Sequence, residues 1–209
     1  MTLAYQIKCI SCRLPLNLCL CAQMPWFKLK TRVVLLMQWG EHKVISNTGH
    51  LIPKIFPNSE IRFRGSKDEV PLNVERLFEA DSAPYVLYPL GGAKELNADF
   101  VKSTSKPLTL IVPDGNWRQA SKMVKRIPAL QSIPKLTLPV GPPSRYRLRS
   151  TKQVDGVCTL EAIARALEII EGQGIQGQVE RYFTLMVERM LWLRSKLKAS
   201  EVTGGIPNN

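Results

Sequence analysis

The hydrophobic pattern of the chain predicts a sheet of buried strands. Several short apolar runs are continuous and end in turn residues, which is typical of strands covered on both faces. Another run alternates between apolar and polar positions, as a strand with one exposed face does. The expected strands lie at residues 32–37, 60–64, 85–88, 108–112 and 136–138.

Between these strands, apolar residues recur every three or four positions, which predicts helices with one buried face. Thr159 precedes the clearest of these patterns and is a candidate N-cap. Three glycines follow that helix and interrupt it, namely Gly172, Gly174 and Gly177. The expected helices lie at residues 51–55, 71–80, 117–127, 159–170 and 178–198.

The length of 209 residues fits one sizeable α/β domain with a small appendage. The apolar content of 44% is enough for a packed core. We therefore expect an α/β domain over residues 28–199, a cysteine-containing segment over 1–27 and a flexible tail over 200–209.

One buried run leads directly into a polar turn. Residues 108–112 are followed by Pro113-Asp114-Gly115-Asn116, and a helix then begins at Trp117. Asp114 or Asn116 can accept hydrogen bonds from the free N–H groups at the helix start, in which case the turn only caps the helix. Alternatively, Asp114 projects from the carboxyl end of a central strand, where open α/β sheets bind ligands. The residues alone leave both readings open.

The formal net charge of +12 indicates an anionic partner, more often nucleic acid than a membrane surface. No run approaches the ~18 apolar residues that a membrane span requires. Cysteines and polar residues interrupt the region in which a secretory signal would need a continuous apolar stretch. We therefore expect a cytoplasmic protein, whose cysteines are metal ligands or free thiols rather than disulfides.

The cysteines Cys9, Cys12, Cys19 and Cys21 have the spacing C-x2-C-x6-C-x-C. Four thiolates this close in sequence can form a tetrahedral structural zinc site, which would stabilise a segment too short for its own core. The second pair is tighter than the common C-x2-C pair, so a redox pair or free thiols remain alternatives. Cys158 is distant from them and is expected to be a small buried hydrophobic residue.

Three further loops carry candidate ligand-binding residues, each with a structural alternative. Ser46-Asn47-Thr48-Gly49 follows a strand and either caps a helix or forms a ligand loop. Pro89-Leu90-Gly91-Gly92 allows a tight turn or the close approach of a ligand. Arg145-Tyr146-Arg147-Leu148-Arg149 suits RNA phosphates and a stacked base, or is a solvated strand face.

Taken in order, these segments resemble the DTW-domain family, the tRNA-uridine aminocarboxypropyltransferases. The matching pieces cover residues 9 to about 170 in the family's order. The sequence departs from the family's usual Asp-x-Thr-Trp signature, because Asn116 stands where Thr is usual. Asn keeps the capacity to cap and to form hydrogen bonds, but it lacks a hydroxyl. The pieces are Cys9/Cys12/Cys19/Cys21, Ser46-Asn47-Thr48-Gly49, Tyr88-Pro89, Asp114-Gly115-Asn116-Trp117, Gln119-Ala120, Ser144-Arg145-Tyr146-Arg147-Leu148-Arg149 and Cys158-Thr159-Leu160-Glu161-Ala162.

The resemblance implies a SPOUT-related fold, in which helices flank a mostly parallel sheet and S-adenosylmethionine is held in loops at the strand ends. It also implies a reaction in which the 3-amino-3-carboxypropyl group of S-adenosylmethionine moves to N3 of a tRNA uridine and 5′-methylthioadenosine leaves. The implied partners are tRNA and S-adenosylmethionine, with Zn²⁺ as a structural metal and no obligate protein partner evident. Two alternatives remain open: an S-adenosylmethionine-dependent RNA methyltransferase and a non-catalytic, zinc-containing RNA-binding protein.

On this hypothesis, Asp114 takes or orients the proton of uridine N3. A helix start beside it would keep the carboxylate ionised, which favours positioning over proton transfer. Trp117 either walls the pocket or packs in the core. We assign Asp114 and Trp117 to catalysis, Pro89, Leu90, Gly91, Asp114, Gly115, Ser144 and Thr159 to donor binding, Asn47, Arg145, Tyr146, Arg147 and Arg149 to RNA binding, and Cys9, Cys12, Cys19 and Cys21 to the metal.

Overall fold

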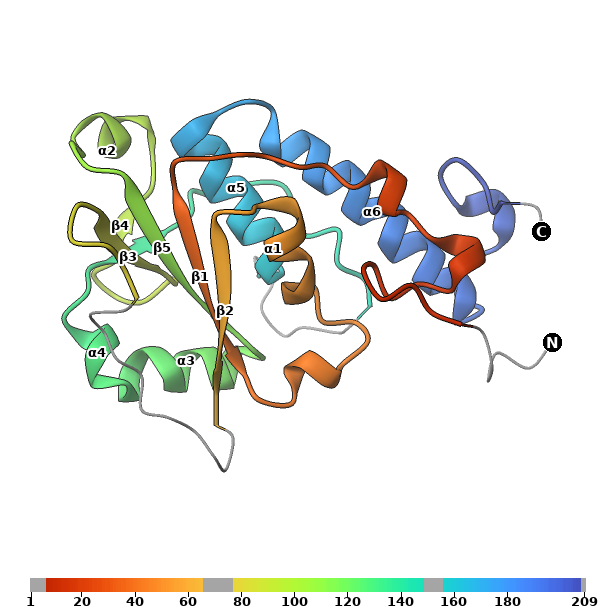
Figure 1. Cartoon of the computed structure of the whole chain (residues 1–209), viewed down its shortest axis with the longest axis horizontal. Coiled ribbons are helices and arrows are strands. Elements are labelled where there is room, and N and C mark those ends of the chain that lie inside the picture. The colour runs from red at the N-terminus through yellow and green to blue at the C-terminus, as the bar shows by residue number, and fades with distance from the viewer. Residues whose placement is uncertain (1–6, 66–76, 149–155, 208–209) are drawn as a thin grey trace.

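The computed structural model describes residues 7–65, 77–148 and 156–207 (Figure 1). Within these residues, a six-stranded sheet has the order β2-β1-β5-β3-β6-β4, and every neighbouring pair of strands is parallel. The expected fold class, a parallel sheet flanked by helices, is confirmed. The strands are β1 (Arg32–Gln38), β2 (Ser59–Arg64), β3 (Ala83–Leu87), β4 (Lys94–Glu95), β5 (Leu108–Asp114) and β6 (Lys135–Thr137).

Strand β5 lies between β1 and β3, and all seven of its residues are buried. Its register with β1 pairs Ile111 with Val34 and Asp114 with Met37. Because both faces of β5 are covered, none of its positions faces solvent, which explains why its apolar run is continuous rather than alternating.

Helices cover both faces of the sheet (Figure 1). On one face, α1 (Ile52–Ile55), α5 (Thr159–Glu171) and α6 (Ile175–Leu193) share a core with Leu35. On the other face, α3 (Trp117–Arg126) and α4 (Pro128–Gln131) share a second core with Leu36. Successive residues of a strand point to opposite faces, so β1 contributes side chains to both cores.

Helix α6 spans Ile175–Leu193 rather than the expected 178–198. Gly174 precedes it with a left-handed φ of 69°, and Ser195 follows it with a φ of 54°. A right-handed helix cannot continue through left-handed residues, so both fix its limits. Lys196 and Lys198, which were expected in the last turn of this helix, therefore lie beyond it.

Part of the carboxyl-terminal segment, where a flexible tail was expected from residue 200, contacts α6. A 3₁₀ turn spans Ala199–Glu201, and Val202 is 4% exposed. The backbone N–H of Thr203 donates to Glu188 Oε2 at 2.8 Å. One buried apolar side chain and one charge-assisted hydrogen bond thus hold this segment on the helix.

Three short elements were not expected from the sequence, namely β4, α4 and helix α2 (Ala98–Lys102). Helix α2 buries none of its residues. The helix expected at 71–80 falls mostly outside the described residues. None of the described helices is long and apolar enough to cross a membrane. Further 3₁₀ turns lie at Leu16–Leu18, Cys21–Gln23, Glu41–Lys43 and Gly49–Leu51.

Candidate active site and cysteine cluster

A cavity of about 750 Å³ opens at the carboxyl edge of the sheet. Residues at or just after the ends of β3, β5 and β6 line it, among them Tyr88, Asp114 and Leu138. Asp114 is the last residue of β5 and is 3% exposed, yet it forms part of the cavity wall. Asp114 is therefore shielded from bulk water while it borders the space that a ligand can occupy. This is the edge at which open α/β sheets bind ligands.

Two side chains from distant segments donate hydrogen bonds to this carboxylate. Asn47 Nδ2 donates to Asp114 Oδ2 at 2.9 Å, and the Thr159 hydroxyl donates to Asp114 Oδ1 at 2.5 Å. Thr159 is the first residue of α5, so the positive end of that helix dipole also favours an ionised Asp114. Strand β5, helix α5 and the loop at residue 47 are thus joined at one carboxylate.

Gly49 allows this loop to approach Asp114 closely. A Cβ at Gly49 would lie 2.6 Å from Met37 Cε and 2.9 Å from Asp114 Oδ2, closer than real Cβ contacts come. The backbone N–H of Gly49 donates to Asn47 Oδ1 at 2.9 Å, which turns the Asn47 amide nitrogen toward Asp114. Any larger residue at position 49 would displace the carboxylate or the side chains behind it.

Asn116, and not Asp114, caps helix α3. Asn116 Oδ1 accepts from the backbone N–H of Gln119 at 3.0 Å, and Gln119 Oε1 accepts from the backbone N–H of Asn116 at 2.8 Å. This reciprocal pair satisfies N–H groups that have no partner within the helix. The capping role that the sequence left open between the two residues is therefore that of Asn116. Asp114 does not cap the helix and lines the cavity instead.

Aromatic side chains form part of the cavity wall. The rings of Tyr88 and Trp117 lie 6.0 Å apart at an angle of 51°, and both residues line the cavity. Tyr146 also lines it, stacked on Phe183 at 5.9 Å. The Tyr146 hydroxyl donates to the carbonyl of Ser46 at 2.8 Å. Aromatic faces of this kind suit a purine or pyrimidine ring.

Glu161 fastens a second wall of the cavity to helix α5. Its side chain is 0% exposed and accepts from the Ser144 hydroxyl at 2.5 Å, from the backbone N–H of Arg145 at 2.7 Å and from that of Cys158 at 3.0 Å. A buried carboxylate is stable only when donors replace the water it has lost. Glu161 therefore fixes the position of the 144–145 loop relative to the start of helix α5, where Thr159 lies.

Two arginines share the buried carboxylate of Glu180. Arg165 Nε lies 3.0 Å from Glu180 Oε1, and Arg145 Nε lies 3.3 Å from Glu180 Oε2. Arg165 is 8% exposed, lines the cavity and donates from Nη1 to the carbonyl of Pro142 at 2.8 Å. The Arg145 side chain is 53% exposed, so one guanidinium of this pair is turned to solvent and the other to the cavity.

The structure brings most of the predicted site residues together. Leu90, Gly91, Arg145 and Arg147 lie outside the cavity lining, and the Arg147 side chain is 54% exposed beside Glu188. Arg149, predicted to bind RNA, lies outside the described residues. Asn47, also predicted to bind RNA, is 5% exposed and holds Asp114 instead of facing outward. The predicted residues that line the cavity are Asn47, Pro89, Asp114, Gly115, Trp117, Ser144, Tyr146 and Thr159.

Cys158 lines the cavity as well, but its thiol is not activated. Desolvation by burial and the nearby Glu161 carboxylate raise the pKa of Cys158 well above its ordinary value. Burial therefore disfavours the thiolate, which is the form that acts as a nucleophile or a metal ligand.

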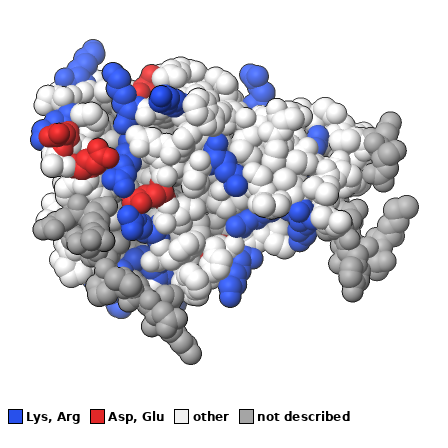
Figure 2. Space-filling model, in the orientation of Figure 1, with Lys and Arg blue, Asp and Glu red and all other residues white. Residues whose placement is uncertain are grey.

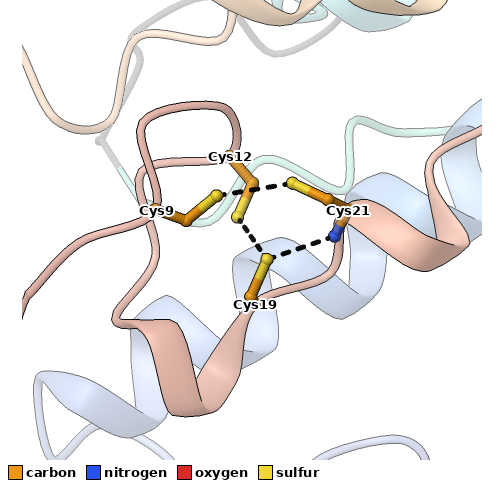
Figure 3. Close-up of side chains that lie close together, drawn as sticks. All are labelled: Cys9, Cys12, Cys19 and Cys21. Carbon is orange, nitrogen blue, oxygen red and sulfur yellow. Dashed lines mark hydrogen bonds between the residues drawn. The ribbon is translucent and has the colours of Figure 1, made fainter.

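The four N-terminal cysteines converge in space (Figure 3). Their sulfur atoms all lie within 4.8 Å of one another, and none is in a disulfide. Cys9 Sγ lies 3.5 Å from Cys21 Sγ, and Cys12 Sγ lies 3.7 Å from Cys19 Sγ. These separations are close to the ~3.8 Å that follows from a 2.3 Å Zn–S bond in a tetrahedral site.

The thiols of this cluster differ in acidity. Backbone N–H groups of Cys12 and Ser11 lower the pKa of Cys9 to about 6. Desolvation and neighbouring sulfur atoms raise the pKa of Cys21 to about 12. Four adjacent thiolates repel one another, so full ionisation at neutral pH needs a cation among them.

The cysteine segment is anchored on helix α6, beside which it lies in Figure 1. Arg189 Nη1 donates to the carbonyl of Leu18 at 2.8 Å. Leu14, Leu18 and Leu20 are buried and belong to the same core as α5 and α6. The segment therefore depends on the main domain for its apolar contacts.

The family model of the DTW domain matches residues 6–191, a range that includes the cysteine cluster, Asp114 and helix α5. The chain belongs to the DTW-domain family. The resemblance drawn from the ordered motifs is therefore confirmed.

Two curated relatives have the name tRNA-uridine aminocarboxypropyltransferase 2. The protein of Macaca fascicularis is 26% identical over 172 residues, and that of Drosophila melanogaster is 24% identical over 169 residues. The matches cover 78% and 79% of this chain, but 56% and 67% of those proteins. The DTW-domain chain thus spans little more than half the length of the Macaca relative.

One solved structure is similar, that of the SAM-dependent rRNA:acp-transferase Tsr3 from Vulcanisaeta distributa. The TM-score is 0.47 and the sequence identity 16%, over 84% of this chain and 85% of that chain.

Proposed function

We propose that the protein transfers the 3-amino-3-carboxypropyl group of S-adenosylmethionine to N3 of a uridine in tRNA, releasing 5′-methylthioadenosine. The observation that carries this proposal is the cavity around Asp114, built from the DTW-family motifs at the carboxyl edge of a parallel sheet. The names of the curated relatives support the same reaction.

The cavity suits a nucleoside donor. Its volume of about 750 Å³ lies in the range of ligand pockets. Tyr88 and Trp117 offer aromatic faces, while Asp114 and Arg165 add one negative and one positive group to the wall. S-adenosylmethionine combines an adenine ring, a cationic sulfur centre and a zwitterionic amino acid, and these are the features that such a wall can bind.

Asp114 acts on the uridine and not on the donor's leaving group. Asn47 donates to one oxygen of Asp114 and Thr159 to the other, which fixes the plane of the carboxylate at the cavity wall. From that position the carboxylate can meet the N3–H group of a bound uridine and orient the nitrogen while the new carbon–nitrogen bond forms. The two donors and the helix dipole stabilise the anion, so Asp114 mainly positions N3. The N3 proton is released to water as the carbon–nitrogen bond forms and the carbon–sulfur bond breaks.

Regiochemistry is then a matter of placement. The nitrogen must meet the γ-carbon of the aminocarboxypropyl group rather than the methyl carbon, and the orientation of the bound donor decides between them. Pro89, Gly115 and Ser144 line the same cavity as Asp114 and would hold the donor in that orientation.

The surface charge suits tRNA. The net charge of the chain is +12. Figure 2 shows Lys and Arg side chains across most of the visible face, whereas Asp and Glu lie mainly toward one side. The exposed side chains of Arg145 and Arg147 follow Ser144, which lines the cavity, so they can contact phosphates while a uridine enters it. A cytoplasmic location, where tRNA would be met, remains a prediction.

The cysteine cluster fits a structural zinc ion. Cys9, Cys12, Cys19 and Cys21 supply four soft ligands at suitable spacing, and a closed set of four leaves no open position for catalysis. A bound zinc ion would compensate the thiolate charges and so lower the pKa of Cys21, which burial and the neighbouring sulfur atoms raise above that of Cys9.

The test is nucleoside mass spectrometry of tRNA incubated with the purified protein and S-adenosylmethionine. We expect an aminocarboxypropyl adduct on uridine. A methyl adduct would replace this proposal with a methyltransferase, and tRNA binding without any adduct or donor affinity would indicate a non-catalytic RNA-binding protein. Asp114→Asn should fold and bind tRNA but lose at least ~100-fold in transfer rate, whereas Asp99→Asn, whose side chain is 93% exposed on α2, should not.

A further inference from the structure

The guanidinium of Arg165 is buried without a full set of partners. Nε pairs with Glu180 and Nη1 with the carbonyl of Pro142, but Nη2 is buried and has no hydrogen-bond partner among the described residues. Buried polar groups nearly always have partners, so an unpaired donor on a residue that lines a cavity is a candidate for contact with a bound ligand atom.

The charges around Arg165 lead to the same conclusion. Arg145 and Arg165 together carry two positive charges on the single carboxylate of Glu180. The other carboxylates of the site have partners of their own: Glu161 accepts from Ser144 and two backbone N–H groups, Asp114 from Asn47 and Thr159, and Glu41 from Asn47 at 3.4 Å. The group formed by Arg145, Arg165 and Glu180 therefore carries one net positive charge.

We propose that Arg165 forms an anion-binding site in this cavity, and that Nη2 binds the carboxylate of the donor's aminocarboxypropyl group. The inference rests on the proposed function, which supplies that donor. Arg165 is a binding residue here, and its role is to select donors that carry an amino-acid carboxylate and to hold the transferred chain.

An RNA phosphate is the other source of an anionic oxygen, but burial disfavours it. Arg165 is 8% exposed, whereas the exposed Arg145 and Arg147 meet the surface along which an RNA backbone would run. Arg165 also lies on the same helix as Thr159, six residues or roughly 9 Å further along its axis. A small molecule can therefore meet Asp114 and Arg165 together.

The experiment compares two ligands that differ only in the amino-acid part. S-adenosylhomocysteine carries the carboxylate, and 5′-methylthioadenosine lacks it. Calorimetric titration of the wild-type protein should give roughly 10- to 100-fold tighter binding of S-adenosylhomocysteine, as one charge-assisted contact implies. Arg165→Gln should remove most of that preference and leave the affinity for 5′-methylthioadenosine unchanged. Arg145→Gln, which also pairs with Glu180 but lies outside the cavity lining, should keep the preference.

Each other outcome overturns the inference. An unchanged preference in Arg165→Gln would show that another group binds the carboxylate. Equal loss of both ligands together with a lower Tm would show a structural role only. Weaker tRNA binding with an unchanged preference would make the anion an RNA phosphate. If Arg165→Gln does not fold, Arg165→Lys serves instead, because it keeps the charge but not the forked geometry, and the preference should fall several-fold. Failure of the wild-type protein to bind either ligand would overturn the proposed function itself.

Discussion

Thr159 donates its hydroxyl hydrogen to Asp114 Oδ1 across 2.5 Å, which joins the first residue of helix α5 to the last residue of strand β5. Asn47 completes the arrangement on the other carboxylate oxygen. These two donors come from opposite sides of Asp114 in the sequence, so the carboxylate orientation is set by the tertiary fold and not by the local turn. Removing either donor should loosen the group that the proposed reaction depends on.

Thr159→Val tests this orientation with a nearly isosteric change. Loss of one hydrogen bond to a charged group should lower the transfer rate by roughly 10- to 100-fold and the free energy of unfolding by about 1–2 kcal/mol. Thr159→Ser keeps the hydroxyl and should retain most of the activity. The measurement is transfer of labelled aminocarboxypropyl group to tRNA, with urea unfolding alongside.

Thr184→Val is the matched control, because that hydroxyl donates to the carbonyl of Glu180 within α6 at 2.8 Å and Thr184 is not part of the cavity lining. It should leave transfer unchanged. Wild-type activity in Thr159→Val would mean that Asp114 does not need this donor.

The buried strands were predictable because burial on both faces leaves a continuous apolar run. β1 and β5 follow this rule, and their residues were placed within two positions of the observed ends. β4 could not be found, since two exposed residues, Lys94 and Glu95, form it by pairing with β6 alone. The strand order also lies beyond the sequence pattern, because it depends on which apolar faces pack together.

The candidate site was predictable as separate motifs but not as contacts. Asp114 was placed at a strand end, yet its bonds to Asn47 and Thr159 span 67 and 45 residues and follow from the parallel sheet. Glu161 appeared only within a family motif, because its partners include backbone N–H groups that any residue supplies. Arg165 had no signal at all, since a charged residue in an amphipathic helix is typical of a solvated face.

Glu161→Gln should destabilise the protein and the site together. The amide keeps the size of the side chain but turns one acceptor into a donor, which leaves a buried N–H group of Arg145 or Cys158, or the Ser144 hydroxyl, without an acceptor. A loss of about 2–4 kcal/mol is expected, which lowers the Tm of a chain of this size by roughly 4–16 °C. Differential scanning calorimetry measures this loss.

The control for Glu161 is Glu95→Gln, at an exposed position of β4, which should shift the Tm by no more than about 2 °C. Equal melting of the two variants would contradict the view that Glu161 holds the 144–145 loop on helix α5.

Cys19→Ser should abolish zinc binding, because three thiolates and a hydroxyl do not form a stable structural site. The purified wild-type protein should contain close to one zinc per chain by elemental analysis, and the variant close to none. The loss should cost at least about 2 kcal/mol, or roughly 4–8 °C in Tm, since the cysteine segment shares a core with α5 and α6. Prolonged treatment with a chelator should have the same effect on the wild-type protein.

Cys158→Ser is the control that shows whether zinc loss is specific to the four clustered cysteines or follows the removal of any thiol. Cys158 lies outside the cluster of four, so this variant should keep its zinc. Zinc retained in Cys19→Ser, or absent from the wild-type protein, would contradict a four-cysteine site.

Asn116→Thr restores the residue that is usual in the family, and it should change little. Asn116 acts through its cap on Gln119, and a threonine hydroxyl can accept the same hydrogen bond. We expect a change in the free energy of unfolding below about 1 kcal/mol and transfer activity close to that of the wild-type protein. Asn116→Ala removes the cap and should cost about 1 kcal/mol.

Asn97→Ala is the comparison that separates stability from chemistry. Asn97 caps helix α2 in the same way, by accepting from the backbone N–H of Phe100 at 2.9 Å, but it lies outside the cavity lining. Both alanine variants should lose similar stability, while Asn116→Ala alone should also slow transfer several-fold, because Trp117 and Gly115 flank that cap on the cavity wall. If Asn116→Thr loses activity as fully as Asp114→Asn, then the Asn116 side chain contacts the reactants and is more than a cap.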